Sequence, residues 1–145
     1  MFFSRLSVAL IFLAVAICVG CGDGRPGRVP VSGRVLIDGE PLEHGNIRFH
    51  PPGQRAASAK LGPGGRFTLS TYEFGDGCVT GVHAVSILGT EVLNAQARKW
   101  HAPPKYSGPA SSKLSYEVTG PTDSAEFNLS WEGKEPYIER MAGGE

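Results

Sequence analysis

Residues 31–49 constrain the fold of this chain most strongly, because two runs of alternating apolar and polar residues flank an Asp38-Gly39 pair. In an extended chain, alternate residues of 31–37 point to one side, and residues 46–50 follow the same period of two. Asp-Gly is a strong turn signal, but Pro41 to Gly45 lengthen the connection between the runs. We therefore predict a β-domain that begins with two strands joined by a loop, not by a tight two-residue hairpin.

The N-terminus carries a membrane-targeting leader. A single Arg5 precedes the apolar run 6–19, which is too short to span a bilayer comfortably as a permanent helix. This arrangement is typical of a secretory signal. The end of the leader, Gly20-Cys21, resembles a bacterial lipobox, in which a small residue precedes a cysteine that is diacylated and becomes the mature N-terminus.

The lipobox resemblance implies that residues 1–20 are a lipoprotein signal peptide and that Cys21 is the lipidation site. Cys18 is a poorer candidate because the bulky Ile17 precedes it. A plain signal peptide and an uncleaved anchor are the alternatives. Each buried methylene of an acyl chain contributes about 0.8 kcal/mol, so two or three chains would hold a small domain firmly at a membrane.

Residues 21–30 are rich in Gly and Pro and lack apolar periodicity. We predict a flexible tether that spans up to about 30 Å when it is extended. Gly22, and not Asp, follows the cysteine, which resembles the sorting pattern of Gram-negative lipoproteins of the outer membrane. The expected location is the cell envelope, lipid-anchored at the outer membrane, with the side of that membrane left open.

Composition indicates one small domain and excludes a nucleic-acid partner. The full chain carries 14 basic and 14 acidic side chains, and loss of Arg5 with the leader makes the mature chain slightly acidic. Binding to nucleic acid requires a basic field, and no Lys/Arg cluster supplies one here. The 20 Gly and 11 Pro indicate many turns between short strands, so we expect a monomeric β-sandwich.

Three cysteines are present, but only Cys78 remains unmodified after processing at Cys21. No intramolecular disulfide can then form. Cys78 has no basic neighbour close in sequence, so we interpret it as a small buried hydrophobic residue and not as a reactive thiol.

Further alternating runs predict four more strands, at 66–70, 82–87, 114–118 and 125–131. Phe67 and Phe127 occupy the apolar phase of their runs and are predicted core residues. His83 shares its face with Val85 and Ile87, so we predict a structural and not a catalytic role for this histidine.

Three segments carry a family resemblance, and their sequences are GRVLIDGEPLEHGNIRFHP (33–51), GGRFTL (64–69) and GDGCVTGVHAVSI (75–87). They are similar to carboxypeptidase regulatory-like, transthyretin-related β-sandwich domains. More narrowly, they resemble short planctomycete lipoproteins that carry one such domain. A Pro-x-Tyr loop at 104–106 and the two strands after it are similar to the closing section of that group, so the resemblance covers residues 31–131.

The resemblance implies an all-β fold, an antiparallel Greek-key β-sandwich of about seven strands of the transthyretin (prealbumin) type. It places the domain at residues 31–131, between the tether and a polar C-terminal tail at 132–145 that we expect to be frayed. Residues 90–100 are expected to form a helical turn or, equally well, a mobile loop. The related domains usually carry an aromatic residue where His83 stands.

No sequence motif for catalysis or metal binding is present. The four histidines, His44, His50, His83 and His101, lack the spacing of common zinc motifs and would meet only through tertiary folding. The two Asp-Gly pairs are interpreted as turns and not as calcium ligands. No Gly-x-Ser-x-Gly motif occurs, and the characteristic patterns of transthyretin-like ureide hydrolases and intradiol dioxygenases are absent. We therefore predict no catalytic residues, no metal and no cofactor.

One stretch is a candidate surface for a partner. Trp100, His101 and Tyr106 lie in an aromatic- and proline-rich segment, and the alternative is an edge loop in which Tyr106 packs on the sandwich. We predict a membrane-anchored envelope lipoprotein whose non-catalytic module binds a protein or glycan or serves a structural role. The second hypothesis is a small periplasmic hydrolase or metalloenzyme on a transthyretin-like scaffold.

Overall fold

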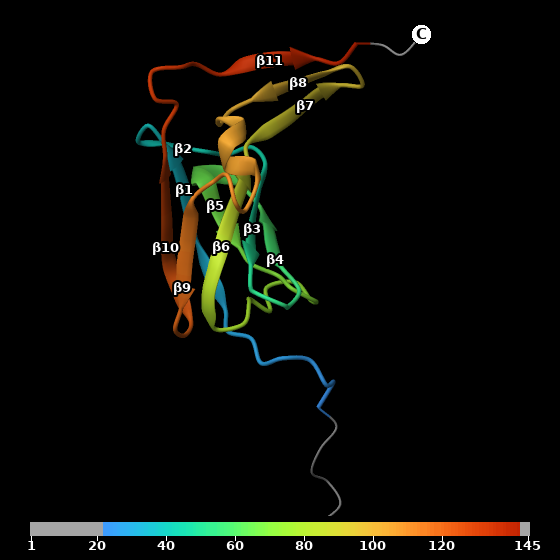
Figure 1. Cartoon of the computed structure of the whole chain (residues 1–145), viewed down its shortest axis with the longest axis vertical. Coiled ribbons are helices and arrows are strands. Elements are labelled where there is room, and N and C mark those ends of the chain that lie inside the picture. The colour runs from blue at the N-terminus through green and yellow to red at the C-terminus, as the bar shows by residue number, and fades with distance from the viewer. Residues whose placement is uncertain (1–21, 143–145) are drawn as a thin grey trace, which may run out of the picture.

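The computed structural model describes residues 22–142, which form an all-β protein (Figure 1). The predicted signal peptide, residues 1–20, and the predicted lipidation site, Cys21, lie outside the described residues. The strands in chain order are β1 (Val31–Ile37), β2 (Glu40–Pro41), β3 (Asn46–His50), β4 (Ala57–Lys60), β5 (Arg66–Thr68), β6 (Gly81–Leu88), β7 (Thr90–Asn94), β8 (Ala97–Trp100), β9 (Leu114–Val118), β10 (Thr122–Leu129) and β11 (Tyr137–Arg140).

Two short 3-10 segments, η2 (Pro63–Gly65) and η3 (Pro104–Ser107), connect some of these strands. Within residues 22–142 no helix is long and apolar enough to cross a membrane. The predicted all-β class is confirmed. The sequence predicted a sandwich of about seven strands, and the described residues form eleven strands, of which eight lie in the two four-stranded sheets and three in a separate sheet.

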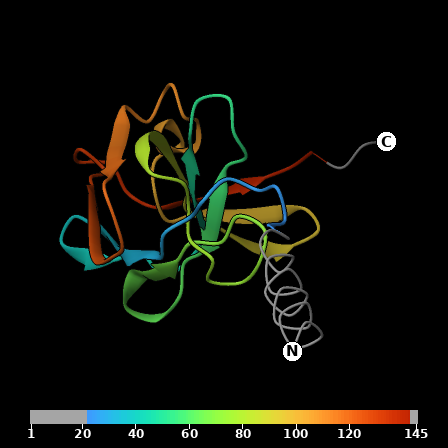
Figure 2. The ribbon, with the colours of Figure 1, turned by 90° about the horizontal axis from the view of Figure 1, so that it is seen from below.

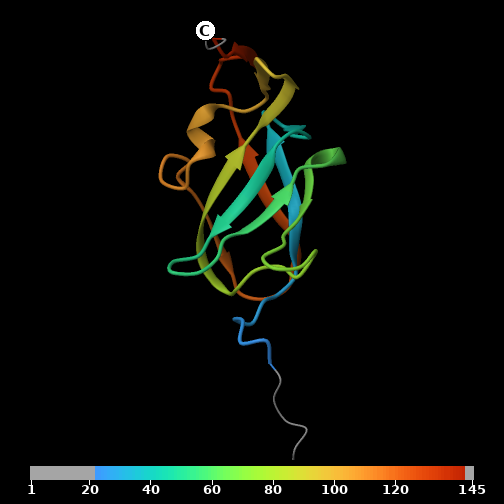
Figure 3. The ribbon, with the colours of Figure 1, turned by 90° about the vertical axis from the view of Figure 1, so that its right-hand side faces the viewer.

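Two four-stranded sheets lie face to face as a sandwich. The front sheet has the order β4-β3-β6-β9, and in the back sheet β1 pairs with β10, β2 and β5. Figure 3 shows β3, β4 and β6 in front of β1 and β10, and the view along the long axis separates the same layers (Figure 2). A three-stranded sheet of order β11-β8-β7, here called the end sheet, lies at one end of the sandwich (Figure 1).

The hydrophobic core lies between the front and back sheets. Phe49 of the front sheet meets Phe67 and Phe127 of the back sheet, with ring centroids 6.4 Å and 5.8 Å apart. All three side chains are buried. Alternate residues of packed sheets face the interior, which is the pattern that the sequence predicted. The prediction that Phe67 and Phe127 are core residues is confirmed.

The Asp38-Gly39 turn corrects the prediction for the first two strands. Both residues have positive φ, 47° and 83°, as a two-residue hairpin turn of the primed type requires. β1 and β2 pair directly across this turn, with Ile37 opposite Glu40. Residues 46–50 then form β3 in the other sheet. The predicted looped pair is therefore wrong, since a tight hairpin is followed by a crossing between sheets.

One pairing departs from the predicted antiparallel arrangement. β1 runs parallel to β10, with Val35 opposite Phe127 and Ile37 opposite Leu129. The other pairings of the described strands are antiparallel. Alternation reports which residues share a face, and it carries no information on the direction of the neighbouring strand. The back sheet is therefore mixed.

Residues 90–100 form the β7–β8 hairpin, and the predicted helical turn or mobile loop is wrong. Asn94 closes the turn, because its side-chain oxygen accepts a hydrogen bond of 2.9 Å from the backbone N–H of Gln96. Asn favours such turns because its short side chain bonds to the backbone two residues further on.

β11 lies within the segment 132–145, for which the sequence predicted a frayed tail. It pairs with β8, and the ring of Tyr137 stacks on Trp100 with a centroid distance of 6.3 Å. The carboxylate of Glu139 accepts hydrogen bonds from Arg98 and from the indole N–H of Trp100. These contacts join positions about 40 residues apart in sequence, so a local pattern does not reveal them.

The chain enters the sandwich at the end opposite the end sheet (Figure 1). Val29 and Cys78 exchange two backbone hydrogen bonds of 2.9 Å and 3.1 Å, so the predicted tether joins the domain at Val29. The neighbouring loop is held by Asp76, whose carboxylate accepts three backbone N–H bonds from residues 71–73 and pairs with Arg28 at 2.9 Å. The Asp76 carboxylate thus stabilises the backbone of a turn, as the sequence predicted for the Asp76-Gly77 pair.

Electrostatics agrees with a structural role for this loop. Burial alone would raise the pKa of Asp76, but the backbone N–H donors of Thr71, Glu73 and Tyr72, together with the Arg28 guanidinium, outweigh it and lower that pKa. Burial raises the pKa of the Cys78 thiol to about 11. Cys78 is therefore a buried, protonated residue, in line with the prediction from the sequence.

Candidate functional site

The three predicted binding residues do not form one surface. Trp100 and Tyr106 are each only 7 % exposed. Trp100 packs in the end sheet, and the Tyr106 hydroxyl accepts a hydrogen bond of 3.2 Å from the backbone N–H of Ser130. Both aromatic rings therefore stabilise the fold, as the alternative interpretation of Tyr106 held. Only His101 has a partially exposed side chain that meets other ionisable groups.

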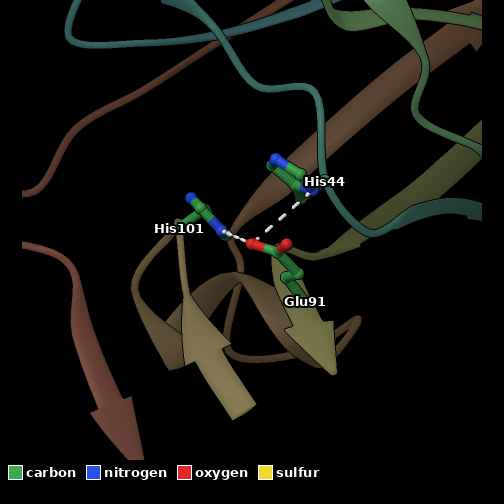
Figure 4. A group of neighbouring side chains, drawn as sticks. All are labelled: His44, Glu91 and His101. Carbon is green, nitrogen blue, oxygen red and sulfur yellow. Dashed lines mark hydrogen bonds and ion pairs between the residues drawn. The ribbon is translucent and has the colours of Figure 1, made fainter. Parts of the chain in front are cut away.

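His101 joins His44 and Glu91 in a compact group (Figure 4). Its Nε2 lies 2.8 Å from Oε2 of Glu91, which is a hydrogen-bond distance. Nδ1 of His44 lies 3.9 Å from the same oxygen. The two imidazole rings stack with centroids 4.3 Å apart and an interplanar angle of 17°. One nitrogen of each imidazole thus lies near the same carboxylate oxygen.

Three separate parts of the chain supply this group. His44 precedes β3, Glu91 lies on β7, and His101 directly follows β8. The backbone N–H of His101 donates a hydrogen bond of 2.7 Å to the carbonyl of Gly89, which positions this residue against the start of the β7–β8 hairpin.

Gly45 positions the other histidine. It has φ +108°, and a Cβ at this residue would lie 1.9 Å from the carbonyl oxygen of Leu88. Only glycine adopts this backbone conformation readily and tolerates so close an approach. The His44-Gly45 segment is therefore held against the same Leu88-Gly89 junction that receives His101.

The electrostatics of the group favours an ionised carboxylate. The hydrogen bond from His101 lowers the pKa of Glu91; burial opposes this shift, and the nearby charges of His44, His101 and Lys99 add to it, so the pKa lies below its ordinary value. Glu91 is therefore negatively charged at neutral pH. An ionised carboxylate beside two imidazoles forms a surface ion pair or binds a metal ion.

The sequence did not indicate that His44 and Glu91 lie together, and it pointed to His101 only as part of an aromatic- and proline-rich segment. The three residues are separated by 47 and 10 positions, with no motif spacing between them. Their convergence depends on the crossing from the back sheet to the front sheet before β3. No local signal in the sequence reports that crossing.

A hollow lies on the outer face of the front sheet, and its lining includes His50, Ser86 and Arg48. Nε2 of His50 lies 2.8 Å from the hydroxyl of Ser86, which is the distance between a base and a nucleophile. Among the described residues, no carboxylate forms a hydrogen bond with His50. Ser86 also lies within β6, directly opposite Arg48 of β3. The contact between His50 and Ser86 is therefore a diagonal contact between neighbouring strands.

His83 lies on β6 of the front sheet, and its side chain is fully buried. Its Nε2 lies 2.8 Å from the carbonyl oxygen of Val79, so Nε2 carries the proton and donates it. Its Nδ1 is buried without a hydrogen-bond partner. The ring contacts Phe49 with a centroid distance of 5.6 Å. This environment is that of a core residue, in agreement with the structural role predicted from the sequence.

We expect His83→Phe to keep or raise the melting temperature. The substitution leaves the Val79 carbonyl without its donor, which costs about 1–3 kcal/mol, but it removes an unpaired buried nitrogen of similar cost and adds apolar contact. Differential scanning fluorimetry of the two proteins measures the difference. His83→Ala is the control and should be less stable, because it leaves a cavity. A large fall for both variants would contradict this account.

Scans against protein-family models, curated proteins and solved structures found no match to this chain.

Proposed function

We propose that this protein is a cell-envelope lipoprotein, anchored to a membrane through lipid on Cys21, whose β-sandwich is a non-catalytic module for binding or structural roles. The observation that carries the proposal is the apolar leader ending in Gly20-Cys21. The arrangement of the fold supports it, because the chain enters the domain at one end and the end sheet lies at the other (Figure 1). An anchored domain of this shape would point the end sheet away from the membrane.

The proposal includes a transthyretin-related, Greek-key type for the sandwich and a monomeric, outer-membrane protein. The support is that the resembling segments fall on paired strands, with 33–51 covering most of β1 and all of β2 and β3. Residues 64–69 contain β5, and 75–87 contain most of β6. An envelope protein or a glycan is the proposed partner class. The slightly acidic mature chain does not suit a nucleic acid.

Cys21→Ser tests the anchor. In a Gram-negative host grown with labelled palmitate, this variant should lose the label and leave the membrane fraction, because lipid is the proposed attachment. Cys18→Ser is the matched control, since it alters the neighbouring cysteine of the same leader and should keep both label and membrane attachment.

Two results of that experiment would contradict the proposal. Membrane retention of an unlabelled Cys21→Ser protein would mean that residues 6–19 stay as an uncleaved anchor. Loss of label from Cys18→Ser, with Cys21→Ser still labelled, would move the lipid to Cys18.

The alternative function is a small periplasmic hydrolase or metalloenzyme. One observation supports it, the convergence of His44, Glu91 and His101, because this is a ligand type used by zinc proteins. The His50–Ser86 pair offers less support, since no carboxylate among the described residues orients His50. A bound metal ion without measurable turnover would fit the non-catalytic module as well as the alternative does.

A further inference from the structure

We propose that His44, Glu91 and His101 form a binding site for a divalent transition-metal ion of the zinc class, at the end of the sandwich beside the end sheet. This inference is independent of the lipid anchor and adds a metal-ion ligand to the envelope module. The three residues are the one group of three or more His, Cys, Asp or Glu side chains in residues 22–142 with this geometry.

The distances between the donor atoms suit one small ion. One ligand atom from each of His44, Glu91 and His101 lies within 4.8 Å of the ligand atoms of the other two. Two of the separations are 2.8 Å and 3.9 Å. Zinc–ligand bonds of about 2.0–2.2 Å in a tetrahedron place neighbouring ligands about 3.3 Å apart. The observed separations lie on both sides of that value, so small side-chain rotations would seat an ion, with the proton that Nε2 of His101 donates to Glu91 released to solvent or moved to Nδ1.

The backbone holds the ligands near this geometry before any ion binds. His101 is fixed to Gly89 by its backbone hydrogen bond, and Gly45 is packed against Leu88 and Gly89. Both histidines are thus positioned against the same two residues, Leu88 and Gly89, at the junction of β6 and β7. Glu91 lies two residues beyond that junction on β7. Preorganised ligands lose little conformational entropy on binding, which strengthens the site.

The donor types select the ion. Two neutral imidazoles and one carboxylate suit Zn²⁺, Cu²⁺ or Ni²⁺, whereas Mg²⁺ and Ca²⁺ prefer sites made of oxygen ligands. The side chains of His44 and Glu91 are 45 % and 37 % exposed, so solvent can reach the group and complete the coordination. Three protein ligands with one open position are the usual composition of an accessible zinc site.

The competing explanation is a surface ion pair between His101 and Glu91. Such pairs contribute about 0–1 kcal/mol and need no third residue. His44 distinguishes the two explanations. At 3.9 Å from Oε2 of Glu91 it makes no hydrogen bond to the carboxylate, yet its ring is stacked on His101 with its Nδ1 turned toward the group (Figure 4). A metal site requires His44, and the ion pair does not.

The test is calorimetric titration of the untagged full-length protein, purified in detergent, with ZnCl₂. We expect one ion per chain. Loss of a residue that supports a metal ligand weakens metal binding by roughly tenfold to hundredfold. Loss of a direct ligand should weaken it by at least as much. His44→Ala, Glu91→Gln and His101→Ala should each show this loss. Titration with Co²⁺ adds a spectroscopic readout, because visible absorption reports the coordination geometry of the bound ion.

Matched controls separate the site from general affinity for metal. His50→Ala removes a histidine outside the group, and Glu117→Gln removes a carboxylate on β9; both should bind Zn²⁺ like the wild type. Circular dichroism checks that each variant is folded. His44 and Glu91 are exposed enough that their variants should keep the fold.

Three outcomes would overturn the proposal. They are the absence of stoichiometric Zn²⁺ binding by the wild type, equal loss of binding in the His50→Ala control, and unchanged binding by His44→Ala. The last result would leave the His101–Glu91 ion pair as the explanation of the group. None of these results bears on the lipid anchor, which the Cys21→Ser experiment tests separately.

Discussion

Phe49→Ala is expected to lower the free energy of unfolding by about 3–5 kcal/mol, a large part of the total of about 5–15 kcal/mol for a domain. Phe49 is 0 % exposed and lies among aromatic rings of both sheets at the centre of the core. Its ring centroid lies 5.7 Å from Tyr116 and 5.8 Å from Phe127. Its removal deletes the apolar contact and leaves a cavity that the sheets cannot fill without moving.

Urea denaturation followed by circular dichroism measures this change, with the midpoint compared at unchanged slope. Phe74→Ala is the matched control, because Phe74 is 96 % exposed and its loss should change stability by less than about 0.5 kcal/mol. Equal effects of the two substitutions would mean that Phe49 does not hold the two sheets together.

Gly33→Ala is expected to destabilise the protein severely, by more than the roughly 1–3 kcal/mol of ordinary overpacking. A Cβ at Gly33 would lie 1.8 Å from the carbonyl oxygen of Ala125 and 2.9 Å from its Cα. These atoms belong to the backbone of β10, so no side-chain rotation relieves the clash. The parallel pairing of β1 with β10 would have to open at this point.

Gly120→Ala is the control for that substitution. A Cβ at Gly120 meets nothing within 4 Å, and its backbone does not have positive φ. This variant should be as stable as the wild type or more stable by about 0.4–1 kcal/mol, through a reduced entropy of the unfolded chain. Thermal melts of both variants make the comparison. A Gly33→Ala protein that melts with the wild type would contradict the close β1–β10 approach.

Local sequence determined most of the sandwich strands. The runs of period two predicted residues of β1, β3, β5, β6, β9 and β10, and they placed Phe67 and Phe127 in the core. The reason is that alternation of apolar and polar residues is imposed by burial of one face, which each strand records in its own residues.

The local prediction failed where pairing depends on residues elsewhere in the chain. Residues 90–100 and 137–140 lack a clear apolar alternation, and their strands are stabilised by Trp100, Tyr137 and Glu139 across the end sheet. The Asp38-Gly39 pair indicated a turn, but the sequence did not indicate that β3 pairs in the other sheet.

Tertiary structure alone decided the direction of β1 relative to β10 and the convergence of His44, Glu91 and His101. Strand order and direction depend on contacts between distant residues, which the period of a single run does not encode. The sequence by itself therefore determined the position and the buried face of most sandwich strands. Only the folded chain determined which strands are neighbours, and with them the group of side chains that we propose binds a metal ion.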